Sequence, residues 1–158
     1  MSYSPDQRHR KRERRVSNSP VGVRIATNED LRFVASTWFH SVLKSGAAVN
    51  ELPYAVFKLG MEANIQALLK RAAVRVAFAA ETPDEILGYV VLETKNVLEL
   101  VWVLKTICHH VYVKSMYRRQ SIARSLIGDV KTYTHPATPG AGKKFALAMG
   151  LSYNPRLA

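Results

Sequence analysis

The chain has 158 residues, 47% of them apolar, which is long enough for one domain with a proper core and too short for two. Its net charge of +11 favours phosphate-bearing partners, but charge alone does not choose between a small molecule, nucleic acid and a membrane surface. No apolar run approaches the roughly 18 residues of a spanning helix, and the charged start argues against a secretory signal peptide. Cys108 is the only cysteine, which excludes an internal disulfide and suits a reducing cytoplasm.

Residues 1–20 form a basic tail that carries +4, from six basic and two acidic residues. The tail has almost no apolar side chains to bury, so we expect a disordered basic N-terminal arm. Basic arms of this kind commonly bind nucleic acid through its phosphates, and a solubilising extension is the alternative. Residues 21–158, with +7 from 17 basic and 10 acidic residues, are expected to form the folded domain.

The first half of this domain is predicted to hold one strand and two helices. Alternating apolar residues predict a strand from Val21 to Ala26, and Thr27 followed by acidic residues predicts a helix start. That helix is expected to end at Ser45-Gly46. Pro53 suits the first position of a second helix, whose apolar stripe faces the core.

Antiparallel strands are predicted next, at residues 74–80, 86–93, 97–104 and 106–113, with a turn at 82–85. Gly88 permits a bulge or the close approach of a neighbouring strand. The run at 97–104 is either an inserted strand or one arm of a lengthened hairpin. A strand at 131–137, a short helix at 140–149 and an extended segment from Ser152 complete the chain.

The segment 111–126 carries the sharpest functional signal. Its first residues alternate as in a strand, and from Arg119 onward the apolar residues recur on one helical face. A helix start offers unpaired N–H groups and a partial positive charge. Three arginines lie beside it, so this turn is suited to a phosphate group: Arg118, Arg119 and Arg124.

Residues 118–123 read Arg-Arg-Gln-Ser-Ile-Ala, which resembles the acetyl-CoA signature of the GNAT acetyltransferase superfamily, Gln/Arg-x-x-Gly-x-Gly/Ala. Arg118 fits the first position and Ala123 the last, whereas Ser121 replaces the central glycine. The order of the predicted elements also resembles that family, apart from the extra run at 97–104. The resemblance implies an α/β, GNAT-like fold with a mixed central sheet flanked by helices, and acetyl-CoA as co-substrate.

In that family the loop amides cradle the pyrophosphate of CoA, and the preceding strand pairs with its pantetheine arm. The residues that the resemblance implies for CoA binding are Val111, Tyr112, Val113, Arg118, Arg119, Gln120, Ser121, Ile122, Ala123 and Arg124. Ser121 is tolerated in a helical backbone, or can even donate to a phosphate. It obstructs the site if the loop needs a positive φ.

Acetyl transfer to an amine needs a base for the ammonium group and an acid for the leaving thiolate. The base candidates are Glu93, Glu99, His109 and His110. Neighbouring strand residues point to opposite faces, so only one histidine is expected to face the cleft. His110 is preferred because it shares a face with Tyr112.

The family often places a tyrosine acid where this chain has Ala146. Tyr153 is the nearest substitute and Tyr133 the second. No third Cys, His or carboxylate stands at ligand spacing, so no metal site is expected.

The sequence therefore predicts an acetyl-CoA-dependent N-acetyltransferase that acts on an unidentified amine in the cytoplasm, with no membrane partner. The alternative is a catalytically degenerate protein of this fold, a structural or nucleic-acid-binding module associated with a phage virion. A narrower resemblance, to acetyltransferase-like proteins of tailed phages, rests on V-Y-V-K-x-x-x-R-R followed by Y-T-H and N-P. It implies the host cytoplasm or the virion as location, and nucleic acid or a virion protein as a partner of the tail.

Overall fold

The computed structural model describes residues 20–45, 53–98, 100–135 and 141–158. Residues 1–19 of the predicted basic tail, and Glu99, lie outside these residues. The described strands are β1 (Val21–Ile25), β2 (Ala73–Ala79), β3 (Thr82–Leu98), β4 (Trp102–Val113), β5 (Thr132–Tyr133) and β6 (Ser152–Tyr153). The helices are α2 (Asn28–Lys44), α3 (Tyr54–Arg71), α4 (Ile122–Ile127) and α5 (Ala141–Ala148), with 3-10 turns η1 (Ser115–Tyr117) and η2 (Pro155–Leu157).

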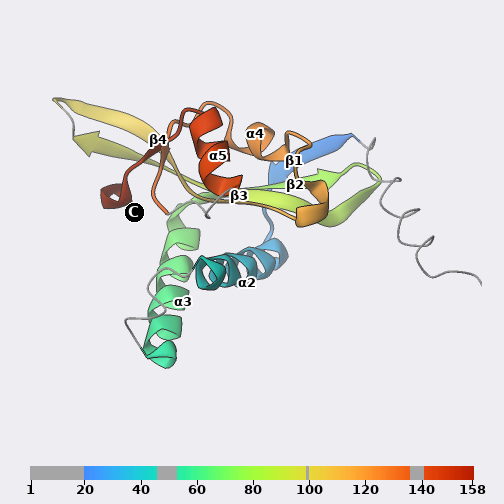
Figure 1. Cartoon of the computed structure of the whole chain (residues 1–158), viewed down its shortest axis with the longest axis horizontal. Helices are drawn as coiled ribbons and strands as arrows, with labels where there is room; N and C mark the ends of the chain where they lie inside the picture. The colour runs from blue at the N-terminus through green and yellow to red at the C-terminus, as the bar shows by residue number, and fades with distance from the viewer. Residues whose placement is uncertain (1–19, 46–52, 99, 136–140) are drawn as a thin grey trace, which may run out of the picture.

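The strands form one mixed sheet in the order β1-β2-β3-β4-β5-β6. The first three pairings are antiparallel, and the β4–β5 and β5–β6 pairings are parallel. Helices α2 and α3 lie on one side of the sheet, and α4 and α5 lie on the other (Figure 1). The predicted α/β fold, a mixed sheet flanked by helices, is confirmed.

Two apolar clusters hold these layers together. The cluster between the sheet and α2–α3 includes Val34, Trp38, Ile65, Leu68, Val76 and Tyr89, each at most 1% exposed. The cluster under α4 and α5 includes Ala77, Val90, Cys108, Ile122, Leu126 and Ile127. The middle of the sheet is thus covered on both faces, whereas the outer ends of β3 and β4 are exposed.

The start of α2 follows the predicted capping pattern. The Thr27 hydroxyl accepts from the Asp30 backbone N–H, and the Asp30 carboxylate accepts in return from the Thr27 N–H at 2.7 Å. Arg24 of β1 also donates to the Asp30 carboxylate. This hydrogen bond holds the pKa of Asp30 below its usual range, although burial opposes the shift. The cap therefore ties the first helix to the first strand.

The predicted run at 97–104 is neither an inserted strand nor a single arm of a lengthened hairpin. Its residues belong to both arms of a long β3–β4 hairpin, in which Leu98 pairs with Trp102. The predicted turn at 82–85 is also wrong, because the chain turns at Ala80 and Glu81 and Thr82 already pairs with Ala79. At residues 82–85 the pairing of β3 with β2 therefore outweighs the local preference of the sequence Thr-Pro-Asp-Glu for a turn.

The elements after β4 are shorter than predicted. Helix α4 begins at Ile122 rather than near Arg119, because Ser121 has a left-handed backbone that no helix can contain. Of the predicted strand at 131–137, residues 132 and 133 pair as β5, and 136–137 lie outside the described residues. The predicted helix at 140–149 is confirmed as α5. In the described part of the chain no helix is both long and apolar enough to cross a bilayer.

Gly88 of β3 pairs with Val113 of β4 and has no room for a side chain. A Cβ at this position would lie 2.6 Å from the Tyr112 carbonyl oxygen and 3.2 Å from the Val113 Cα. Gly88→Ala is therefore expected to destabilise the fold by about 1–3 kcal/mol, because backbone atoms must move. Gly60→Ala in α3, where a Cβ meets nothing within 4 Å, is the matched control and should stabilise the fold slightly. Urea unfolding of both variants checks this, and equal midpoints would contradict it.

Candidate functional site

A cavity opens where the parallel strands β4 and β5 separate. The two strands pair only at Ile107–Thr132 and Cys108–Tyr133, and the Thr134 N–H then donates to the Cys108 carbonyl at 3.1 Å. Beyond this point β4 continues to Val113 without pairing with β5. A cavity of about 100 Å³ lies there, lined by Cys108, His109, His110, Val111, Tyr133, His135, Gly142, Phe145, Ala146 and Leu151. Ligands commonly bind at such a divergence of parallel strands, where backbone groups lack partners.

A β-bulge places both neighbouring histidines at this cavity. Val91 of β3 pairs with His110 and Leu92 pairs with Cys108, so His109 is an extra residue in β4. The alternation of side chains is interrupted there. The prediction that only one histidine can face the cleft is therefore wrong, because it assumed an unbroken strand.

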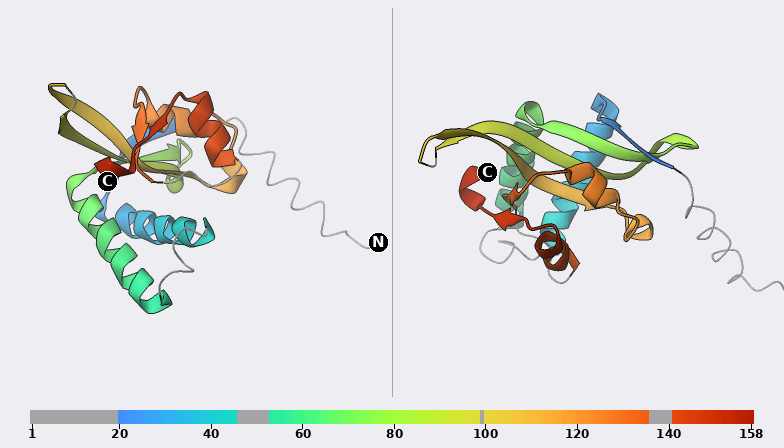
Figure 2. Two further views of the ribbon diagram at one scale, coloured as in Figure 1. Left: turned by 60° about the vertical axis from the view of Figure 1, so that its left-hand side comes forward. Right: turned by 90° about the horizontal axis from the view of Figure 1, so that it is seen from above.

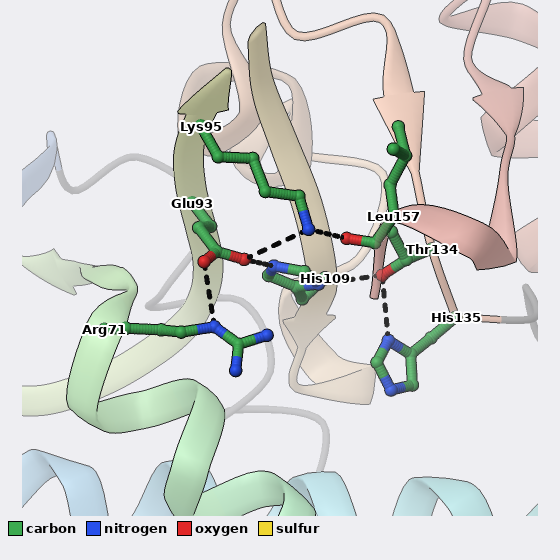
Figure 3. Close-up of polar contacts among 7 residues, drawn as sticks. All are labelled: Arg71, Glu93, Lys95, His109, Thr134, His135 and Leu157. Carbon is green, nitrogen blue, oxygen red and sulfur yellow. Dashed lines mark hydrogen bonds and ion pairs between the residues drawn. The ribbon is translucent and has the colours of Figure 1, made fainter. Parts of the chain in front are cut away.

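A chain of hydrogen bonds runs from the cavity to a carboxylate at the base of the β3–β4 hairpin (Figure 3). His109 Nε2–H donates to Glu93 Oε2 at 2.8 Å, which leaves His109 Nδ1 to accept from the Thr134 hydroxyl at 2.8 Å. Thr134 Oγ1 then accepts from His135 Nδ1–H at 3.1 Å. We call Glu93, His109, Thr134 and His135 the relay.

Basic side chains surround the carboxylate end of the relay. Arg71, the last residue of α3, donates from Nε to Glu93 Oε1 at 2.8 Å. The Lys95 ammonium lies 3.9 Å from Glu93 Oε2 and donates to the Leu157 carbonyl. Burial acts to raise the pKa of Glu93, but the hydrogen bonds from His109 and Arg71 outweigh it, and the pKa is lowered. The relay therefore ends on an ionised carboxylate at neutral pH.

The histidines of the site are held neutral. Burial lowers the pKa of His135 to about 4, with a further contribution from His109, and lowers the pKa of His110 to about 3. Burial also lowers the pKa of His109, although the Glu93 carboxylate opposes the shift. Neutral imidazoles can both donate and accept, so the relay can pass a proton between the cavity and Glu93.

His110 has a different environment from the relay. Its ring stacks on Trp38 with centroids 5.0 Å apart and planes 4° apart, and it lines the cavity. Among the described residues, His110 Nε2 and Trp38 Nε1 are the buried side-chain polar atoms without a hydrogen-bond partner. Such an atom is costly unless a ligand or water satisfies it, so His110 is suited to contact a polar group in the cavity.

These lowered pKa values predict acid sensitivity. The unfolded chain protonates these histidines near their ordinary value of 6.5, whereas the folded chain does so only near or below 4 at His135 and His110. Stability should therefore fall as the pH drops from about 6.5 to 4.5, by up to about 1.4 kcal/mol per pH unit for each histidine. Urea unfolding across this range measures the slope. His110→Phe keeps an aromatic ring on Trp38 and should flatten the slope, and an unchanged slope would contradict this account.

The signature turn presents a row of free amides. Arg119 (φ 68°) and Ser121 (φ 59°) are left-handed, and they are the non-glycine residues with positive φ in the described part of the chain. Left-handed residues that alternate with others turn successive N–H groups toward one concave side, an arrangement that binds anions. No acceptor within the described residues takes the N–H groups of residues 119–123. Ser121 thus has the positive φ that we considered an obstruction, at a cost of about 1 kcal/mol or more.

The other predicted CoA-binding residues lie on the two faces of β4 and in the signature turn that follows it. Val111 lines the cavity, whereas the Tyr112 ring packs beside Phe33 and Tyr89 under α2. Arg118 Nε donates to the Val113 carbonyl at 3.2 Å. Ile122 is buried and Ala123 is partly buried, while five side chains of the turn are exposed: Arg118, Arg119, Gln120, Ser121 and Arg124.

Of the two predicted acids, Tyr133 lines the cavity and Tyr153 does not. Tyr153 is 48% exposed and packs on Tyr133, with ring centroids 5.2 Å apart. Thr134 and His135 were not predicted as site residues. The available signal was their position within the predicted strand at 131–137, which was expected to run parallel to the strand that carries His109.

A larger cavity, of about 500 Å³, lies between α2 and α3 and is lined in part by His40, Tyr54, Lys58, Glu62 and Gln66. None of these residues joins the relay, and the residues that link the two helices are outside the described part. The β4–β5 cavity is therefore the candidate site. In the described part of the chain no group of three or more His, Cys, Asp or Glu could hold a metal ion.

No protein-family model matches this sequence, and no curated protein matches it. Several solved structures do resemble this chain. A possible acetyltransferase from Clostridium difficile 630 has a TM-score of 0.57 at 16% identity, over 85% of this chain and 91% of that chain. A predicted acetyltransferase with acetyl-CoA from Clostridium acetobutylicum has a TM-score of 0.59 at 12% identity, over 84% and 90%. The ribosomal-protein-alanine N-acetyltransferase from Brucella melitensis biovar Abortus 2308 has a TM-score of 0.55 at 16% identity, over 85% and 94%. The fold is that of the GNAT acetyltransferases.

Proposed function

We propose that this protein is an acetyl-CoA-dependent N-acetyltransferase that acts on a primary amine. The observation that carries the proposal is the cavity between β4 and β5, which has a buried proton relay on one side. The fold and the signature turn support the same function. One of the matching structures is described as containing acetyl-CoA.

The residues present fit acetyl-CoA in three respects. The edge of β4 beyond Cys108 does not pair with β5, so its outward backbone groups, apart from the Val113 carbonyl that accepts from Arg118, are available to the amides of a pantetheine arm. The free amides of residues 119–123 and the arginines around them suit phosphates. The cavity of about 100 Å³ has room for a few non-hydrogen atoms, such as an acetyl group, and His110 Nε2 offers it a polar contact.

Acetyl-CoA supplies an acetyl group activated as a thioester. The amine must lose a proton before its nitrogen can bond to the acetyl carbon as the carbon–sulfur bond breaks. His135 accepts that proton at the cavity and releases its Nδ1 proton to Thr134, which passes its own to His109. His109 in turn releases its Nε2 proton to Glu93, from which it reaches solvent. Tyr133, at the cavity wall, is the acid for the departing thiolate, with Tyr153 behind it.

The thiol released from acetyl-CoA in the presence of a panel of primary amines tests this relay. Thr134→Val keeps the shape of the side chain but removes the hydroxyl that links the two histidines. The rate is expected to fall on the order of 100-fold, and Thr134→Ser should restore most of it. Thr94→Val, which loses a hydroxyl on the exposed hairpin, should leave the rate unchanged. Equal rates in Thr134→Val and the parent would show that Thr134 transfers no proton.

Two finer predictions from the sequence stay predictions: that the basic tail binds nucleic acid and that the chain is encoded by a phage. The acceptor amine is left open, because the residues that line the cavity identify no particular amine. The assignment of His110 as base is revised in this proposal, with His110 as a polar contact and His135 at the start of the relay.

A further inference from the structure

The outer part of the β3–β4 hairpin extends beyond the rest of the sheet. Strand β2 pairs with β3 as far as Leu92, and β5 pairs with β4 only at Ile107 and Cys108. Residues 93–98 and 102–106 therefore form a two-stranded arm, and no described strand pairs with its outer edges. The arm projects past the helices in every view (Figures 1 and 2). Two-stranded ribbons with open edges are marginally stable in water and readily take up another strand.

The arm also carries a row of exposed apolar side chains. Cys108 and Leu92 face α4 and α5, so every second residue from them toward the tip of the arm shares that face. Those nearest the tip are Leu98, Trp102 and Leu104, which are 62%, 70% and 67% exposed. Leu100 and Val101 form the tip itself and are 100% and 67% exposed. Contiguous apolar surface of this kind marks an interaction site.

The open edges favour a strand as the covering partner. A lipid bilayer could cover the apolar row, but it offers no hydrogen bonds to the edges of the arm, with which no described strand pairs. A β-strand pairs with such an edge, and its own apolar side chains pack beside those of the row. The arm of a second copy of this chain presents a matching edge and a matching row.

We propose that two copies of this chain form a dimer in which their β4 edges pair antiparallel around Leu104. A two-fold axis at Leu104 uses the part of the β4 edge with which no described strand pairs, from Trp102 to Thr106, and places Trp102 beside Thr106 of the other copy. The apolar rows of the two copies then lie on the same face and join. Lys105 lies beside Val103 of the other copy rather than beside its own symmetry mate, so like charges do not oppose each other.

The surface available fits this occupant. Pairing of the edges brings Trp102 and Leu104 of one copy beside Thr106 and Leu104 of the other, and these apolar side chains are 70% and 67% exposed in the single chain. The row itself carries no charge, since its remaining members are Thr94, Asn96 and Thr106. Each copy has a net charge of +11, so added salt should strengthen the dimer by screening repulsion.

Sedimentation equilibrium of the full chain from micromolar to hundred-micromolar concentration tests this proposal. The parent is expected to dimerise, and more tightly at higher salt. Leu104→Glu places two carboxylates at the axis and should weaken the dimer about 100-fold or more. Leu59→Glu in α3 is the matched control, because Leu59 is 73% exposed and lies away from the arm, and its dimer should match the parent's. Melting of each variant at low concentration verifies the fold.

A charge pair identifies the second copy as the partner. Leu104→Lys alone should be monomeric, and mixing it with Leu104→Glu should restore a heterodimer through the opposed charges. A monomeric parent at all concentrations, or a dimer that Leu104→Glu leaves intact, would overturn the proposal. Binding of a monomeric parent to vesicles of anionic phospholipid, weakened by salt, would overturn it in favour of a membrane surface.

Discussion

Glu93→Gln is expected to lower the rate of acetyl transfer by about 10²–10⁴-fold while acetyl-CoA affinity stays within about twofold. Glu93 is the ionised end of the relay, held by His109 Nε2–H at 2.8 Å and by Arg71 at 2.8 Å. The amide of glutamine cannot take up the proton, so the relay has no terminus. The site for the thioester is unaffected, since Glu93 does not line the cavity.

Thiol release measures the rate and calorimetry measures the affinity of the same preparations. Glu62→Gln is the control, because Glu62 is an exposed member of an ion pair with Lys58 on α3. Equal rates in Glu93→Gln and the parent, with acetyl transfer otherwise intact, would remove Glu93 from the mechanism without affecting the proposed function.

Reversing two charges at the signature turn is expected to abolish acetyl-CoA binding. Arg118→Glu with Arg119→Glu removes two cations beside the free amides of residues 119–123 and puts two carboxylates in their place. A phosphate group then meets repulsion instead of pairing, and we expect affinity to fall by more than about 100-fold. Isothermal titration measures the loss.

Arg32→Glu with Lys70→Glu is the matched control for this double variant. Both residues are exposed on α2 and α3, and the change in net charge is the same. Retained binding in the control with loss at the turn would assign the phosphates to residues 118–124. Equal affinity in the two double variants would place the CoA phosphates elsewhere.

The overall fold could be predicted from local patterns. The Thr27 cap, the apolar stripes of the two long helices and the alternation in the strands are all read over a few residues. The long β3–β4 hairpin could not be predicted in this way, because residues 98–101 are Leu-Glu-Leu-Val and include no glycine, proline or asparagine to indicate a turn.

The site was predictable in part. The cavity at the end of β5 and the signature turn follow from the order of the elements. The bulge at His109 is a one-residue shift in pairing, which alternation within one strand does not reveal. Thr134 and His135 come to His109 through parallel pairing between segments 25 residues apart, a distance that no local pattern covers. The backbone of Ser121 was left open by the sequence, and its positive φ is a property of the folded turn.

The central claim is that this chain binds acetyl-CoA between β4 and β5 and transfers its acetyl group. Isothermal titration of the parent chain with acetyl-CoA tests it most directly. The account predicts saturable binding at one site per chain, with the affinity lost in the Arg118 and Arg119 double variant. Absence of heat up to millimolar acetyl-CoA would contradict the account and favour the catalytically degenerate alternative.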